Sequence, residues 1–124
     1  MNEARFERLA AEALDSLPEQ FLVHLENVEV VIEHLPSAED LADAGLEGEP
    51  PESLLGLYFG VPLTERDSSY AALPDRITLY QGSIEAVAGE DPEAVREEVQ
   101  ATVIHEIAHY YGISDERLEE MGWD

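Results

Sequence analysis

The stretch from Asp91 to Gly112 constrains the fold most, because it carries a complete set of helix signals. Asp91 is a favourable N-cap residue, Pro92 suits the first helical position, and Gly112 offers a left-handed stop about 20 residues later. Between these ends, apolar residues recur at four-residue steps, namely Val95, Val99, Val103 and Ile107. The pattern predicts one long helix with a buried face, against which the rest of the 124-residue chain has to pack.

The second half of this predicted helix carries the motif His-Glu-x-x-His. His105 and His109 are four residues apart, so they lie on one helix face, one turn apart. Two imidazoles in this arrangement bind a single zinc ion at Zn–N distances of about 2.0–2.1 Å. Glu106 lies beside the ion rather than under it, where it acts as general base on a water molecule. A polar stripe continues backward from the motif through Thr102 and Glu98.

A catalytic zinc ion usually has three protein ligands and one open position. Gly112 lets the chain turn sharply after the helix, so that Asp115 can return to the ion. A continued helix would instead carry residue 115 about 9 Å beyond His109. We therefore predict one zinc ion per chain, held by His105, His109 and Asp115. Glu119 is the alternative third ligand.

Asp115 has a second interpretation that needs no metal. A last short helix is expected from about Asp115 to Met121, and either Ser114 or Asp115 would be a suitable N-cap for it. The aromatic residues Tyr110 and Tyr111 are interpreted as packing residues rather than oxyanion ligands.

Residues 105–115 resemble the zincin signature. In metzincins the same frame ends in a third histidine. Asp115 stands at that place here, as in Asp-zincin-type peptidases, and Met121 is too close to serve as a Met-turn. The chain also resembles a family of small bacterial zincin-like metallopeptidases in three segments, which with their spacing cover about half of the chain: Gly56–Leu63, Leu73–Tyr80 and His105–Asp115. The resemblance implies a minimal zincin fold, in which a small sheet packs on the active-site helix.

The other elements predict an α+β fold in a single domain of residues 1–124. Apolar residues at helical steps predict a first helix that ends at Pro18, followed by a short helical turn. Strands and helices do not alternate, so we expect helices packed against one small sheet. The expected strands are Val28–Leu35, Leu54–Val61 and Ile77–Gln81. A short helix with Ser83 as its cap is expected over Ser83–Gly89.

Zincins bind peptide in extended form along a sheet edge. The strand Ile77–Gln81 is closest in sequence to the motif helix, so it is the candidate edge strand. In the preceding strand, Gly56 and Gly60 are interpreted as β-bulges. Arg76 is interpreted as an ion-pair partner for the many acidic groups, with substrate orientation as the alternative.

The charge of the chain narrows its partners. The 29 acidic residues outweigh 6 arginines and give a net charge of −23, which repels nucleic acid and anionic membranes and attracts cations. Cysteine is absent, so a metal has to sit on histidine and carboxylate. No stretch approaches the roughly 20 apolar residues of a membrane span, and Met1–Leu14 lacks the apolar segment of a secretory signal. We expect a cytoplasmic protein that binds neither membranes nor nucleic acid.

The expected function is zinc-dependent hydrolysis of a peptide bond in a peptide or protein substrate. Zinc lowers the pKa of water toward about 7, and Glu106 takes the proton and later delivers it to the leaving amine. Two alternatives stay open, a zinc-binding module without catalysis and a hydrolase of a non-peptide amide. Glu106 favours an enzyme, because a structural zinc site needs no base beside its ligands. The oligomeric state and the substrate stay open.

Overall fold

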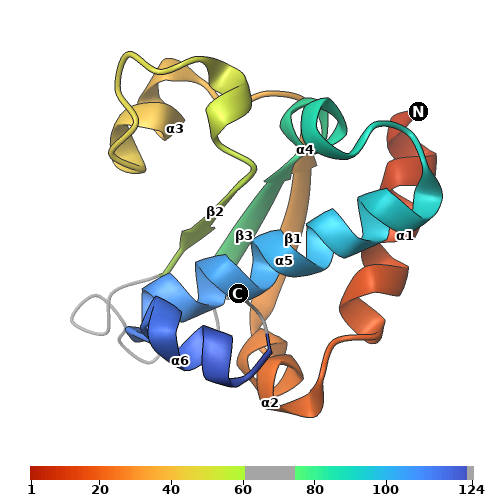
Figure 1. The fold of residues 1–124 in the computed structure, drawn as a ribbon. Helices are drawn as coiled ribbons and strands as arrows, with labels where there is room; N and C mark the ends of the chain where they lie inside the picture. Colours follow the sequence, from red (N-terminus) through yellow and green to blue (C-terminus); the bar gives the residue numbers. More distant parts are fainter. Residues whose placement is uncertain (61–74, 123–124) are drawn as a thin grey trace, which may run out of the picture.

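The computed structural model describes residues 1–60 and 75–122, except the side chain of Asp115 (Figure 1). In chain order the helices and strands are α1 (Glu3–Asp15), α2 (Glu19–Leu22), η1 (Val23–Leu25), β1 (Val28–Glu33), α3 (Ala38–Asp43), η2 (Pro51–Ser53), β2 (Gly56–Phe59), β3 (Asp75–Tyr80), α4 (Gln81–Ala88), α5 (Pro92–Tyr111) and α6 (Asp115–Glu120). This order confirms the expected α+β class, with a small sheet beside a long helix. No helix among the described residues is long and apolar enough to span a membrane.

The strand order in the sheet is β1-β3-β2. Strand β3 pairs in parallel with β1, with Val28 opposite Asp75, and antiparallel with β2, with Gly56 opposite Leu79. The prediction that Ile77–Gln81 forms an edge strand was therefore wrong, since β3 is the central strand. Its Ile77 and Leu79 side chains are fully buried, as expected for a strand with neighbours on both sides. The edge strand next to α5 is β2.

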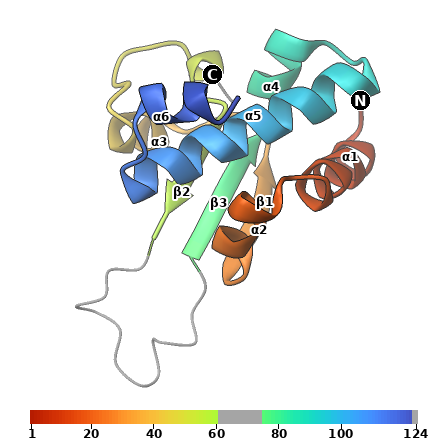
Figure 2. The same cartoon turned by 60° about the horizontal axis from the view of Figure 1, so that its bottom comes forward.

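Helices α1 and α5 cover one face of this sheet, as Figures 1 and 2 show from two directions. Helix α1 contributes a single apolar stripe to the core, and α2, entered through Pro18, adds Phe21. Val28 and Ile32 of β1 pack on this core, but Val30 remains 36% exposed. Burying these side chains together is the main favourable contribution to folding.

The opposite face of the sheet is covered only in part. Leu41 of α3 and Leu54 pack there on Tyr80, whose hydroxyl donates a hydrogen bond to Asp40 Oδ2 at 2.9 Å. Ser37 and Asp40 form the capping box that begins α3. This small second cluster ties α3 and the segment before β2 to the end of β3.

The bounds of α5 confirm the helix signals in the sequence. Asp91 is its N-cap and accepts a hydrogen bond from the Ala94 N–H at 3.1 Å, and Pro92 is its first residue. Gly112 follows its last residue with φ 74°, a left-handed conformation that L side chains rarely adopt. The turn brings the Ile113 N–H to the Ala108 carbonyl at 2.7 Å, which closes the helix end.

Three local expectations were wrong. Helix α4 begins at Gln81, and Ser83 is buried inside it with its Oγ donating to the Pro51 carbonyl at 3.3 Å. Gly56 pairs in regular register, so it is not a bulge; a Cβ there would lie 2.7 Å from Thr102 Cγ2 on α5. Gly60 lies after β2, where a Cβ would collide with the ring of Tyr110. Both glycines therefore allow the backbone to lie close to α5, and neither forms a bulge.

Candidate metal centre

The second half of α5 presents the motif beside strand β2. His105 and Glu106 are half-buried, whereas His109, one turn further on, is exposed. The helix packs on β2 next to these side chains, and Ile107 and Ala108 between them are fully buried. The helix thus holds two imidazoles on adjacent turns at the rim of the core, where one side remains open to an ion.

Glu106 is held by the edge strand. Its Oε1 accepts a hydrogen bond from the backbone N–H of Tyr58 at 3.0 Å. Burial raises the pKa of Glu106 above the ordinary carboxyl value, although the Tyr58 N–H and the two neighbouring imidazoles favour its charged form. A carboxylate with a raised pKa and a fixed orientation is the chemistry expected of a general base.

An aromatic cluster joins the end of β2 to the end of α5. The Tyr58 ring stacks on Tyr110 at a centroid distance of 4.2 Å, and the Tyr58 hydroxyl donates to Asp75 Oδ2 at 2.8 Å. Burial, followed by this hydrogen bond, raises the pKa of Tyr58. Tyr111 packs on His24 at a centroid distance of 4.3 Å. These contacts agree with a packing role for Tyr110 and Tyr111, and they hold β2 against Glu106.

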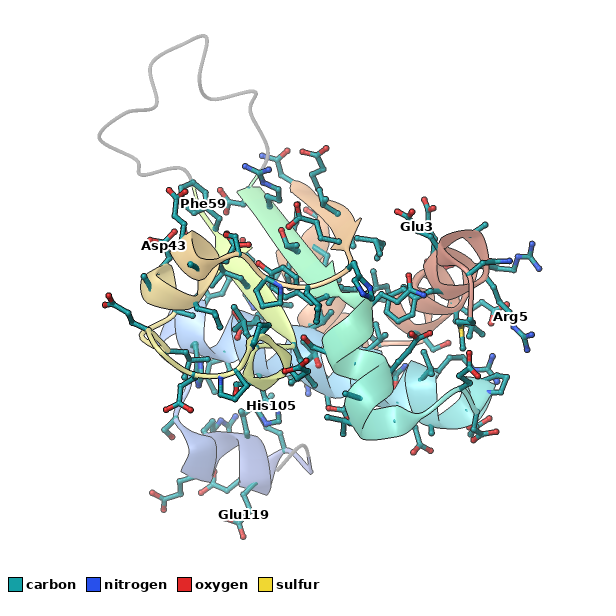
Figure 3. The ribbon with its side chains drawn as sticks, turned by 90° about the horizontal axis from the view of Figure 1, so that it is seen from above. Glu3, Arg5, Asp43, Phe59, His105 and Glu119 are labelled. Carbon is teal, nitrogen blue, oxygen red and sulfur yellow. The ribbon has the colours of Figure 1, made fainter. Side chains whose placement is uncertain are left out.

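The third ligand falls partly outside the described residues. Ser114 is the N-cap of α6, since its Oγ accepts from the Arg117 N–H at 3.1 Å, so Asp115 is not needed as a cap. Asp115 is the first residue of α6, but its side chain lies outside the description. Glu119 is exposed and points away from His105 in Figure 3. Among the described side chains, no three His, Asp or Glu residues meet as a metal site.

A groove of about 270 Å³ runs along α5 on the N-terminal side of the motif. One wall is the segment Ser53–Gly56, which leads into β2, and the other is the polar stripe on the helix. That helix wall consists of Glu98, Ala101, Thr102, His105 and Glu106. The first wall could not be anticipated, because Ser53–Gly56 contains no residue type typical of a site.

Arg76 lies away from the motif. It is exposed on β3 and lines a separate cavity of about 360 Å³ on the face of the sheet opposite α5. Glu33, Asp43 and Phe59 share this cavity, and Figure 3 shows Phe59 and Asp43 near one another at its rim. Arg76 forms no ion pair with any residue in the described ranges, so neither interpretation of its role gains support from a contact.

The comparisons with known proteins agree with this geometry. Residues 25–123 match the family model described as zincin-like metallopeptidase, which includes β2, the groove and all of α5. The chain belongs to the zincin-like metallopeptidase family. A solved structure, a conserved hypothetical protein from Thermus thermophilus, is similar to it, with 32% sequence identity, a TM-score of 0.53, and coverage of 90% of this chain and 94% of that chain. No curated protein matches the sequence.

Family membership supports a zinc peptidase in general. It also confirms the predicted fold, a minimal zincin-like domain built around the motif helix.

Proposed function

We propose that this protein is a zinc-dependent peptidase, in which His105, His109 and Asp115 bind one zinc ion and Glu106 is the general base. The observation that carries the proposal is the pair of imidazoles on one face of α5 beside a half-buried carboxylate fixed by β2. This donor set fits zinc, which prefers imidazole nitrogen and carboxylate oxygen when thiolate is absent. Asp115 fits as the third ligand, because Ser114 already caps α6 and Glu119 points outward.

When bound, zinc acts as a Lewis acid that polarises a carbonyl group and lowers the pKa of water. Glu106 supplies the proton transfer. Its Oε1 is held by the Tyr58 N–H, which leaves the other carboxylate oxygen to take a proton from the attacking water. The same carboxyl group then delivers that proton to the leaving amine.

The substrate is a peptide or a protein bound beside β2. The Tyr80 N–H donates to the Leu55 carbonyl at 3.0 Å, so residues 55, 57 and 59 face β3 and the backbone of Gly56 and Tyr58 faces outward. An extended peptide would pair with the outward backbone groups of Gly56 and with the Tyr58 carbonyl, since the Tyr58 N–H is bonded to Glu106, and would run past Glu106 and the open side of His105. Strand β2 therefore replaces β3 as the proposed peptide-binding edge.

The proposal is tested by Glu106→Gln, which keeps the shape of the side chain and removes the base. A peptide-library digest first supplies a substrate that the parent protein cleaves. We expect the variant to fold, to bind zinc nearly as well as the parent, and to lose about 10²–10⁴-fold in turnover.

An unchanged turnover number in Glu106→Gln would contradict this mechanism even with zinc present. Zinc binding without cleavage of any library peptide would favour the non-catalytic zinc module, and cleavage of small amides alone would favour the non-peptide hydrolase. The Tyr58 N–H bond to Glu106 favours the enzyme, because a zinc site without catalysis has no use for an oriented base beside its ligands.

A further inference from the structure

The groove on the N-terminal side of the motif has features that the proposed mechanism does not use. Glu98, Thr102 and His105 follow one another on a single face of α5, at steps of four and three residues. Glu98 is therefore about 10 Å from His105 along the helix axis, and Thr102 lies between them. The groove leads from the candidate metal centre to a carboxylate about two turns away.

Thr102 is a buried polar residue in this wall, and its hydroxyl has no hydrogen-bond partner among the described residues. The residue is only 7% exposed, and its Oγ1 makes no hydrogen bond, alone in this respect among the buried side-chain atoms of the described ranges. A buried hydroxyl in this condition is costly, and a donor that enters the groove would relieve the cost. Opposite Thr102, Gly56 has no side chain, and a Cβ there would lie 2.7 Å from Thr102 Cγ2.

Glu98 is the carboxylate of the groove that the proposed mechanism does not use. It is half-buried and makes no ion pair with any residue in the described ranges. The opposite wall, Ser53–Gly56, is uncharged, so nothing on that wall neutralises Glu98. Each basic group of a ligand would also be attracted by the net charge of −23.

We propose that this groove is the specificity pocket for an arginine or lysine side chain next to the scissile bond, with Glu98 as the recognition carboxylate and Thr102 as an accepting hydroxyl. The inference rests on the proposed peptidase function. A stem of three or four methylene groups carries the cation along the apolar part of the groove, past Leu54, Leu55 and Ala101. An arginine Nε–H would donate to Thr102 Oγ1 and its terminal nitrogens to Glu98.

The pocket is tested with two capped pentapeptide amides, Ala-Ala-Arg-Ala-Ala and its citrulline analogue, which has nearly the same shape without the charge. Binding is measured by calorimetry on zinc-loaded Glu106→Gln, so that the peptides are not cleaved. We expect the arginine peptide to bind about tenfold more tightly than the citrulline peptide. Adding Glu98→Gln should reduce this ratio to about one. Thr102→Val should instead weaken both peptides about twofold to threefold, because citrulline keeps the N–H that would donate to Thr102.

The matched control is Glu97→Gln, since Glu97 is exposed on the same helix, carries the same charge and does not line the groove. This control should keep the tenfold ratio, so that general attraction by an acidic surface is separated from recognition by Glu98. The pocket would be rejected if the arginine and citrulline peptides bind equally well with Glu98 in place. It would also be rejected if the arginine peptide keeps its tenfold preference in Glu98→Gln.

The parent protein is then incubated with the same arginine peptide. If the arginine peptide binds about tenfold more tightly but the parent protein cleaves no peptide, the peptidase function is rejected and the pocket is retained. Cleavage that ignores the arginine would reject the pocket and retain the peptidase function.

Discussion

Helices α1 and α5 lie on the same face of the sheet and pack on each other, yet they are built differently. Helix α1 buries one stripe, Phe6, Leu9, Ala10 and Ala13, and most of its other residues are charged. Helix α5 buries seven residues distributed around much of its circumference and still carries Glu98, His105 and Glu106 in half-buried positions. A helix needed only for packing would not enclose polar groups, because their partial burial costs stability.

The cost is visible at two positions on α5. Burial raises the pKa of Glu106, and Thr102 Oγ1 lacks a hydrogen-bond partner in the described part of the chain. Helix α1 carries no comparable group, and its polar contacts serve attachment: Glu12 pairs with Arg96 at 3.1 Å, and the Ala13 carbonyl accepts from Gln100 Nε2 at 2.8 Å. The difference teaches that α1 supplies stability, whereas α5 gives up some stability to carry the polar groups of the proposed site.

The largest effect is expected when the proposed zinc ligands on the polar side of α5 are removed. His105→Ala and His109→Ala should each reduce bound zinc from about one ion per chain to a trace, because two remaining ligands do not hold a catalytic zinc ion. Elemental analysis of dialysed protein measures the zinc content, and circular dichroism should show that both variants fold. If both variants keep a full zinc ion, the site lies elsewhere.

The same measurement separates the two candidates for the third ligand. Asp115→Ala should weaken zinc binding much more than Glu119→Ala, since Glu119 points away from His105. The reverse order of affinities would make Glu119 the ligand.

The next largest effect is expected for the packing residues of α1. Phe6 of α1 is fully buried, so Phe6→Ala should lower the free energy of unfolding by about 3–5 kcal/mol. Urea denaturation measures the loss, and zinc bound per folded chain should not change. The matched control is Phe59→Ala, the same deletion at a residue that is 56% exposed, which should change stability by less than about 1 kcal/mol. Equal losses in the two variants would show that α1 does not anchor the core.

The smallest effect is expected for Tyr80, on the other face of the sheet, and it tests whether that face also contributes only to stability. Tyr80→Phe removes the hydrogen bond to Asp40 and should cost about 1 kcal/mol near pH 7. Burial, and then Asp40, raise the pKa of the Tyr80 hydroxyl above its ordinary value near 10. The folded state therefore holds this proton more tightly than the unfolded chain, so the contribution is fully present below about pH 10 and is lost as the pH rises through the raised pKa.

Urea denaturation at pH 7 and at several values above pH 10 tests this sign. The stability difference between the parent and Tyr80→Phe should shrink as the pH rises. A difference that grows with pH would mean that the folded state favours the ionised phenol, contrary to the contacts of Tyr80.

The sequence predicted what short-range signals encode. Asp91, Pro92 and Gly112 define α5 because capping and left-handed termination depend on adjacent residues. It did not predict the strand order, since pairing of β3 with β1 and β2 joins residues far apart in the chain. Counting apolar residues would not have found the central strand, because the edge strand β1 has four apolar residues in six and β3 has three in six.

The candidate site shows the same division. The spacing of His105, Glu106 and His109 was readable because one helix carries all three. The N–H of Tyr58 that fixes Glu106 was not, since it is a backbone group 48 residues away and any residue type except proline would offer it. Ser53–Gly56, the second wall of the groove, was missed for the same reason.

The bond between Tyr58 and Glu106 has a consequence for how the protein behaves at high concentration. An exposed edge strand invites pairing with the edge of another molecule and so promotes aggregation. Strand β2 is only four residues long, and one of its outward N–H groups already belongs to Glu106. A second copy cannot complete a ladder at that position unless the carboxylate withdraws, and the other edge strand, β1, exposes Glu29 and Glu33. The glutamate proposed for proton transfer therefore also protects the sheet from self-association.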